Sequence, residues 1–103
     1  MADKNVELDP RIELTGFRDI DESSMEIIKK NILHHIHRIE ELARKFERLH
    51  ITLKSVHERE KSEKCDIHAK LNDGGKAYNT HVTERNIFVA IDSALEKLTN
   101  ELD

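Results

Sequence analysis

The last segment of the chain is apolar along one side at helical spacing, and this feature most constrains the fold. Apolar residues recur there at steps of three and four, at Phe88, Ile91, Leu95, Leu98 and Leu102. Because residues three and four positions apart share one face of an α-helix, the pattern predicts a helix over 86–102 with a single buried stripe. A lone helix cannot bury such a stripe. The chain therefore needs a sheet on which this helix can lie.

Four earlier segments alternate apolar and polar residues, a pattern typical of half-buried β-strands. They lie near 11–15, 49–57, 65–72 and 76–83. The sequence Asn-Asp-Gly-Gly at 72–75 tolerates positive φ angles, so the last two strands are expected to form a hairpin. Residues 58–64 are expected to form a charged connector between two of the strands.

A second, longer helix is expected over 23–47. Its buried face is predicted to contain Met25, Ile28, Ile32, Ile36, Ile39, Ala43 and Phe46. Residues 21–24 supply side-chain oxygens that can cap a helix, and Ser23 precedes Glu26 by three residues, which is the spacing of a capping box. The element order is then β-α-β-β-β-α. The predicted fold class is α+β, a four-stranded sheet with two helices on one face.

The size and charge of the chain limit how many domains it can form and which kinds of partner it can have. A length of 103 residues suits one domain. Residues 1–10 are polar, end at Pro10 and are expected to form a flexible tail, which leaves 11–103 as the single domain. The formal net charge of −4 weighs against a nucleic-acid partner. The distribution of charge matters more than its sum, because clustered cations can contact phosphate while carboxylates lie elsewhere.

The sequence also indicates where in the cell the protein is located. It contains neither a signal-peptide pattern nor an apolar segment long enough to cross a bilayer. The opening Met1-Ala2-Asp3-Lys4 is typical of a cytoplasmic protein. Cys65 is the only cysteine, so no internal disulfide can form, in agreement with a reducing compartment. We therefore expect a cytoplasmic protein without a membrane partner.

Basic residues gather opposite the apolar stripe of the predicted first helix. Close to one line lie Lys30, His34, His37, Arg44, Lys45 and Arg48, with Arg38 at its edge and Glu41 interrupting it. Such spacing can present several cations to adjacent phosphates. The same residues also fit an ordinary solvated surface.

The histidines and the cysteine raise the questions of metal binding and catalysis. His34 and His37 share a helix face, and His50 and His68 project from one sheet surface. No Cys-x-x-Cys or His-Glu-x-x-His motif occurs, so surface imidazoles are favoured and neither a metal nor another cofactor is expected. Cys65 lies at an inward strand position, where a small apolar filler is usual. The sequence predicts no enzyme.

Four short motifs, taken in order, resemble the ribosome hibernation-promoting factors, also called ribosome-associated inhibitors, a sigma-54 modulation protein-like family. They are Leu14-Thr15-Gly16, Ile51-Thr52-Leu53-Lys54, Gly74-Gly75 and the segment from Ala90-Ile91-Asp92 to Lys97-Leu98. The resemblance covers residues 11–102. It implies a fold similar to the double-stranded-RNA-binding module with an added first strand, and a match to the short form of the family.

The resemblance implies a function without catalysis. Family members lodge in the mRNA and tRNA channel of the small ribosomal subunit under stress, inhibit translation and stabilise idle ribosomes. For this chain it implies the small subunit and its rRNA as partners, no small-molecule substrate, and a monomer or weak dimer when free. Taken with the basic line, it gives an expected rRNA-binding set of Lys30, Arg38, Arg44, Lys45, Arg48, Lys54 and Lys97.

The last helix departs from the family and supports an alternative. Residues 99–103 carry no cation where arginine and lysine are common, and Asp92 and Glu96 add acidic charge. The alternative is a protein–protein interaction module of the same fold, without direct rRNA binding, that uses the open sheet face or Ile27 and Leu33. Steep salt dependence would favour phosphate contacts, whereas a protein contact through apolar surface should be less sensitive to salt.

Overall fold

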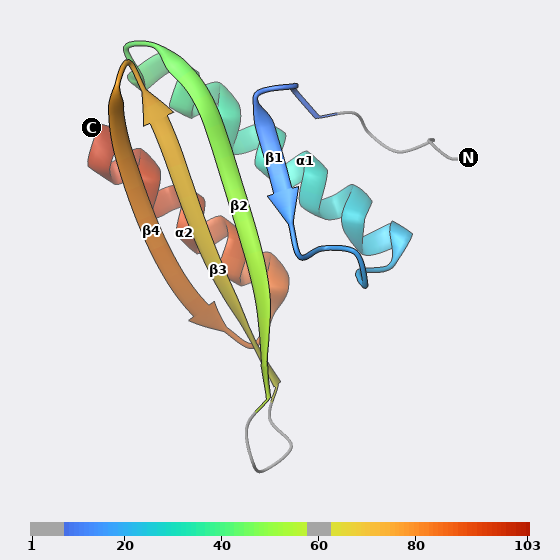
Figure 1. Cartoon of the computed structure of the whole chain (residues 1–103). Helices are drawn as coiled ribbons and strands as arrows, with labels where there is room; N and C mark the ends of the chain where they lie inside the picture. The colour runs from blue at the N-terminus through green and yellow to red at the C-terminus, as the bar shows by residue number, and fades with distance from the viewer. Residues whose placement is uncertain (1–7, 58–62) are drawn as a thin grey trace.

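The elements of the chain occur in the predicted order (Figure 1). The computed structural model describes residues 8–57 and 63–103, so most of the predicted tail and residues 58–62 of the predicted connector lie outside the described residues. The elements are β1 (Ile12–Thr15), α1 (Glu22–Leu42), β2 (Phe46–His57), β3 (Glu63–Asp73), β4 (Lys76–Glu84) and α2 (Ile87–Leu102).

The four strands form one sheet in the order β1-β2-β3-β4. The edge strand β1 runs parallel to β2, and the other neighbouring pairs are antiparallel. Both helices lie on the same face of this sheet, α1 behind β1 and β2 and α2 behind β3 and β4 (Figure 1). The α+β prediction is therefore confirmed. No element of the described residues covers the other face of the sheet.

The two predicted helical stripes meet the inward side chains of the strands in one core. The stripe of α1 is buried at Ile28, Ile32, Ile36 and Ile39. The buried set of α2 is Ala90, Ile91, Ala94, Leu95 and Leu98, while Phe88 and Leu102 are only partly buried at its edge. The buried hydroxyl of Thr80 in β4 donates a hydrogen bond to the backbone carbonyl of Ala94, at 3.0 Å, and so ties the sheet to α2. Neither helix in the described residues is long and apolar enough to span a bilayer.

Gly16 allows the chain to leave β1 and pass close to β2. Its φ is +87°, and a Cβ added at this position would lie 2.2 Å from the backbone oxygen of Leu53. Because the obstructing atom belongs to the backbone, no side-chain rotation can relieve the clash. The following Phe17 is buried in the core. The glycine of the Leu14-Thr15-Gly16 motif is thus required by the fold itself.

The predicted end of α1 at residue 47 is wrong, because the helix ends at Leu42. The buried carboxylate of Asp73, at the end of β3, accepts hydrogen bonds from the backbone N–H groups of Arg44 and Lys45, at 3.2 and 2.6 Å. These contacts take donors that a continuing helix would have used internally. The chain turns instead into β2, whose first residue is Phe46.

The helix caps explain where the helices begin. Asp21, the first residue of the predicted capping segment, caps α1 by accepting a hydrogen bond from the N–H of Ser24, at 3.0 Å, and Ser23 is not the cap. This bond lowers the pKa of Asp21. Asn86 caps α2 and accepts from the N–H groups of Phe88 and Val89, so the helix starts within one residue of its predicted start. At its other end α1 stops at Ala43, whose backbone is extended.

Candidate nucleic-acid interface

The side chains that point away from the helices form the open face of the sheet. Side chains alternate between the two sides of a strand, so the outward positions follow from the buried ones, such as Leu49, Ile51 and Leu53 in β2. The open face consists of Glu13, Thr15, Arg48, His50, Thr52, Lys54, Lys64, Asp66, His68, Lys70, Asn72, Ala77, Asn79, His81 and Thr83.

Cations outnumber carboxylates on the open face. Its ionised side chains are the cations Arg48, Lys54, Lys64 and Lys70 and the carboxylates Glu13 and Asp66. Arg48 pairs with Glu13 across β1 and β2, and this hydrogen bond lowers the pKa of the Glu13 carboxyl. Lys54 and Lys70 are exposed and form no ion pair with any residue in the part of the chain that the structure describes. Their charge remains available to a partner.

Three histidines project from the same face. His50 of β2 shares a hydrogen bond of 2.7 Å with the hydroxyl of Thr15 in β1. His68 of β3 and His81 of β4 are directly opposite each other, and their rings stack with centroids 4.1 Å apart and an interplanar angle of 11°. The sequence prediction that His50 and His68 share one sheet surface is confirmed. His81 completes the group.

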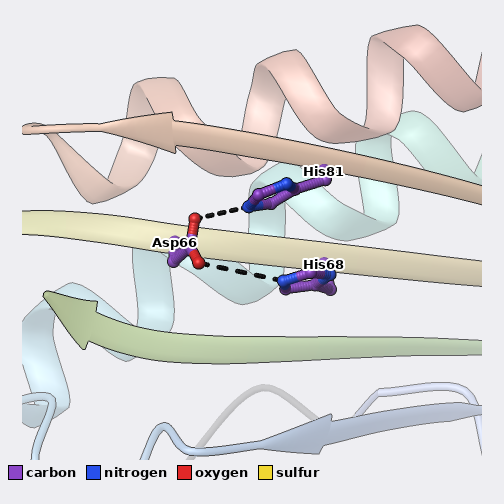
Figure 2. Close-up of side chains that lie close together, drawn as sticks. All are labelled: Asp66, His68 and His81. Atoms are coloured by element: carbon purple, nitrogen blue, oxygen red, sulfur yellow. Dashed lines mark hydrogen bonds and ion pairs between the residues drawn. The ribbon is translucent and has the colours of Figure 1, made fainter.

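Both stacked histidines face the carboxylate of Asp66 (Figure 2). His81 Nε2 lies 2.6 Å from Asp66 Oδ1, and His68 Nε2 lies 3.8 Å from Oδ2. The hydroxyl of Thr83 donates to Asp66 Oδ1, at 2.6 Å. The pKa of Asp66 is lowered, chiefly by the Thr83 hydrogen bond and then by the His81 hydrogen bond. Asp66 is therefore ionised at neutral pH and held in place by residues of β4.

The outer surface of α1 and α2, the helical layer, has the opposite balance of charge. Its cations are Lys29, Lys30, Arg38 and Lys97, and its carboxylates are Glu22, Glu26, Glu40, Glu41, Asp92, Glu96 and Glu101. Arg38 Nη1 lies 3.9 Å from Glu41 Oε1 on the same helix. The predicted rRNA contacts Lys30, Arg38 and Lys97 thus lie among acidic neighbours.

A shallow hollow between the two helices contains charges of both signs. It is lined by His34, His35, Arg38, Glu96, Thr99 and Asn100. Nearby, His35 Nε2 of α1 lies 3.1 Å from Asp92 Oδ1 of α2, which gives Asp92 a contact between the helices. Acidic groups at this hollow would repel phosphate, so it is a poor site for a nucleic-acid backbone.

The predicted basic line on α1 does not exist as one line. Arg44 and Lys45 lie in the connection after the helix, beside the β3–β4 turn, where the N–H of Gly74 donates to the Lys45 carbonyl, at 3.0 Å. Arg48 belongs to β2 and the open face. Only Lys30, His34, His37 and Arg38 remain on α1. The prediction failed because it extended helical spacing past the point where Asp73 ends the helix.

The sequence profile of the family described as sigma 54 modulation protein / S30EA ribosomal protein matches residues 18–103. The chain belongs to this family. The match confirms the resemblance to the hibernation-promoting factors for everything from α1 to the C-terminal helix, and it leaves β1 outside. No curated protein matches the chain.

Solved structures share the fold of this sigma 54 modulation / S30EA family member. A ribosomal subunit interface protein from Coxiella burnetii superposes with a TM-score of 0.62 at 20% identity, covering 88% of this chain and 91% of the other. The N-terminal domain of Thermus thermophilus Protein Y superposes with a TM-score of 0.57 at 12% identity, with the same coverage. At such low identity these likenesses establish the fold alone.

The predicted contact residues of this family member are divided among three places: the open face has Arg48 and Lys54, the helical layer has Lys30, Arg38 and Lys97, and the connection after α1 has Arg44 and Lys45. Sequence reasoning missed Lys70 as a neighbour of the two cations on the open face, although the alternation of β3 placed it outward. It also missed the approach of His81 to Asp66, because cross-strand register depends on the hairpin turn and cannot be read from alternation alone. The turn at Gly74 and Gly75 supplies that register.

Proposed function

We propose that this sigma 54 modulation / S30EA family member is a non-enzymatic ribosome-binding factor of the cytoplasm. It occupies the mRNA and tRNA channel of the small subunit, inhibits translation and stabilises idle ribosomes under stress. The observation that carries the proposal is the excess of cations on the open face of a family fold. Family membership supports the ribosome as partner, and the charge of the open face selects the surface that meets rRNA.

The open face suits a phosphate backbone better than it suits bases. Lysines on neighbouring strands present mobile charges on a sheet face that no described element covers. Tyr78, the only tyrosine, lies at an inward position of β4 and is partly buried, and Phe17 is in the core. The described open face therefore has no phenylalanine or tyrosine ring for stacking bases, and its rings are the imidazoles of His50, His68 and His81. Binding should depend on backbone charge and shape rather than on rRNA sequence.

The remaining predicted contacts have secondary roles in the proposal. Arg44 and Lys45 lie beside the β3–β4 turn, at one end of the sheet, and Arg44 lines a pocket there with Leu42 of α1 and Leu102 of α2. Lys30, Arg38 and Lys97 lie on the acidic helical layer, which we expect to face away from rRNA. We therefore expect Lys54, Lys70 and Arg48 to contribute more to rRNA binding than the cations of the helices do.

Matched charge reversals test which surface binds. Lys54→Glu with Lys70→Glu changes the open face, and Lys30→Glu with Lys97→Glu makes the same change of charge on the helical layer. Binding to isolated small subunits is measured by co-sedimentation across a salt series. The open-face pair should weaken binding and lower the log–log salt slope by about two, since each lost phosphate contact lowers it by about one. The helical pair should leave the slope unchanged.

The outcomes separate the two surfaces. A slope lowered only by the helical pair would assign the interface to the helices and overturn the open-face assignment. Circular dichroism of both pairs checks that the fold is intact. All four lysines are exposed, or outward on the sheet, so their replacement leaves the core untouched.

Channel occupancy needs its own test. Small subunits preloaded with mRNA and tRNA should bind the chain more weakly than empty subunits, because the same space is already filled. The chain should also inhibit translation in a purified system, and the open-face pair should relieve that inhibition. Equal binding to loaded and empty subunits would place the chain outside the channel.

The alternative function is an interaction module that binds a protein through apolar surface. Ile27 of α1 and Val89 of α2 are the exposed large apolar residues of the described chain, at 48% and 47% exposure. Both belong to helices rather than to the sheet. Binding that resists salt and is lost in Ile27→Ser with Val89→Ser would favour this alternative over phosphate contacts.

A further inference from the structure

Asp66, His68 and His81 form a cluster of metal-ligating side chains on the open face. One ligand atom from each residue lies within 4.8 Å of the other two. Asp66 and His68 are two residues apart on β3, and His81 is the cross-strand partner of His68 on β4. The antiparallel register of one hairpin therefore brings the three donors together, and Figure 2 shows both imidazoles pointing at the same carboxylate.

We propose that Asp66, His68 and His81 bind one divalent transition-metal ion of the zinc class, with water completing its coordination. Two imidazole nitrogens and one carboxylate oxygen are a donor set that suits zinc, cobalt(II), nickel(II) or copper(II) rather than magnesium or calcium, which prefer oxygen ligands. Three protein ligands with an open position are common for zinc in sites that keep a bound water. This site does not depend on ribosome binding.

The distances require only local adjustment. Zinc lies about 2.0–2.1 Å from nitrogen and oxygen ligands, so two ligands of a tetrahedral ion are about 3.3 Å apart. His81 Nε2 lies 2.6 Å from Asp66 Oδ1 and His68 Nε2 lies 3.8 Å from Asp66 Oδ2, and one ligand atom of each residue lies within 4.8 Å of the other two. The stacked rings must tilt so that both Nε2 lone pairs converge. Their side chains are 53% and 49% exposed, which leaves room for this rotation.

The carboxylate is already oriented for the ion. Thr83 donates its hydroxyl hydrogen to Asp66 Oδ1, a contact that fixes the carboxylate as an outer-shell partner would. In the metal-free chain the proton on His81 Nε2 is donated to the same oxygen. Metal binding at Nε2 requires this nitrogen to be free of hydrogen, so the ring hydrogen of His81 must then lie on Nδ1.

The lysines near the cluster should lower its affinity for metal ions and influence which metal it binds. Lys54 is the β2 residue opposite Asp66, and Lys64 and Lys70 are outward neighbours on β3. These three cations repel a metal ion, whereas Asp66 is the only carboxylate among the described residues of β2, β3 and β4 on the open face. Metals held mainly by electrostatic attraction to carboxylates should bind poorly. Metals with strong affinity for imidazole should be selected.

The test is metal titration of the untagged full chain. Cobalt(II) is added as a spectroscopic probe, because tetrahedral or five-coordinate binding gives visible absorption, and zinc is then added as a competitor. One equivalent of cobalt should bind and zinc should displace it. Zinc titration followed by NMR should move the imidazole signals of His68 and His81 while leaving those of His50 in place.

Variants assign the ligands. His68→Ala and His81→Ala should each lower zinc affinity about tenfold or more, since loss of even an outer-shell partner costs that much. His50→Ala, from the same face but bonded to Thr15, is the matched control and should retain the affinity of the parent chain. Thermal unfolding of each metal-free variant verifies the fold. Binding that survives both ligand variants, or that falls equally in His50→Ala, would overturn the site.

Discussion

The open face of the sheet and the helical layer differ in charge although they belong to one small domain. The sheet surface has an excess of lysine and arginine, whereas the two helices carry more carboxylates than cations. A formal net charge of −4 describes neither surface. The comparison shows that the partner of such a chain is predicted by where the fold places its charges, since a cationic face can contact phosphate even in an acidic protein.

The separation arises from the two periodicities of the chain. In β2 and β3 the cations Lys54, Lys64 and Lys70 occupy outward positions, each two or more residues from the next. In α2 the outward positions carry Asp92, Glu96 and Glu101 instead, with Lys97 as the only cation. Strand alternation thus collects the cations on one surface, and helical spacing collects the carboxylates on the other.

The core that joins the two surfaces gives the largest expected effect. Ile91→Ala removes a fully buried side chain that lies between α2 and the sheet. It should lower the free energy of unfolding by about 2–4 kcal/mol, measured by urea denaturation, because it removes apolar burial and leaves a cavity. Ile27→Ala, at a position 48% exposed, is the control and should cost far less. A loss below about 1 kcal/mol for Ile91→Ala would contradict its place in the core.

Much of the fold could be predicted because burial repeats along the sequence. The stripes of α1 and α2 and the alternation of β2, β3 and β4 all record which side of an element is buried, as at Ile36, Leu53, Ile67 and Leu95. These patterns led to the correct element order and to both helices on one face. They also placed His50 and His68 on the same outward surface.

The end of α1 and the Asp66 cluster could not be predicted, because both depend on contacts between distant residues. Nothing near Leu42 in the sequence stops a helix, and the stop comes from the Asp73 carboxylate on another element. The approach of His81 to Asp66 depends on the register of a hairpin. The spacing of residues in the sequence shows which side chains share a face of one helix or strand, but not which elements lie side by side. The predicted rRNA-binding set therefore combined cations of the open face with cations of the helical layer.

The next largest effect is expected at Asp73, which lies at the end of β3 and contacts the connection after α1. Asp73→Ala leaves the N–H groups of Arg44 and Lys45 without their carboxylate acceptor. The variant should lose about 1–3 kcal/mol of unfolding free energy, the usual penalty for unsatisfied polar groups at a buried site. Hydrogen exchange should quicken first at these two amides. Unchanged exchange there would show that Asp73 does not end the helix.

The smallest predicted effect concerns the ion network that joins β1 to α1. The Arg11 guanidinium contacts Asp9 and Glu40, each at 2.6 Å, and lies over the ring of Phe46. The hydrogen bond from Arg11 is the main reason why the pKa of Asp9 falls from 3.8 to about 2. A lowered pKa in the folded state stabilises the fold above the unfolded pKa. This contribution is lost as pH falls from about 4 toward 2.

Asp9→Asn should therefore destabilise the chain at pH 7 and have no effect once the pH is below the folded pKa of about 2. Because Asp9 and Arg11 remain partly exposed to solvent, the loss at pH 7 should stay below about 1 kcal/mol and shrink with added salt. Urea unfolding at pH 7 and at low pH measures the difference. Other carboxylates titrate in the same range, so the comparison is repeated in an Arg11→Met background, where Asp9→Asn should cost less at pH 7 because only the hydrogen bond from the backbone N–H at position 11 remains. An equal loss in both backgrounds would mean that Asp9 stabilises the start of β1 through the backbone N–H at position 11 and that its contact with the Arg11 guanidinium contributes nothing.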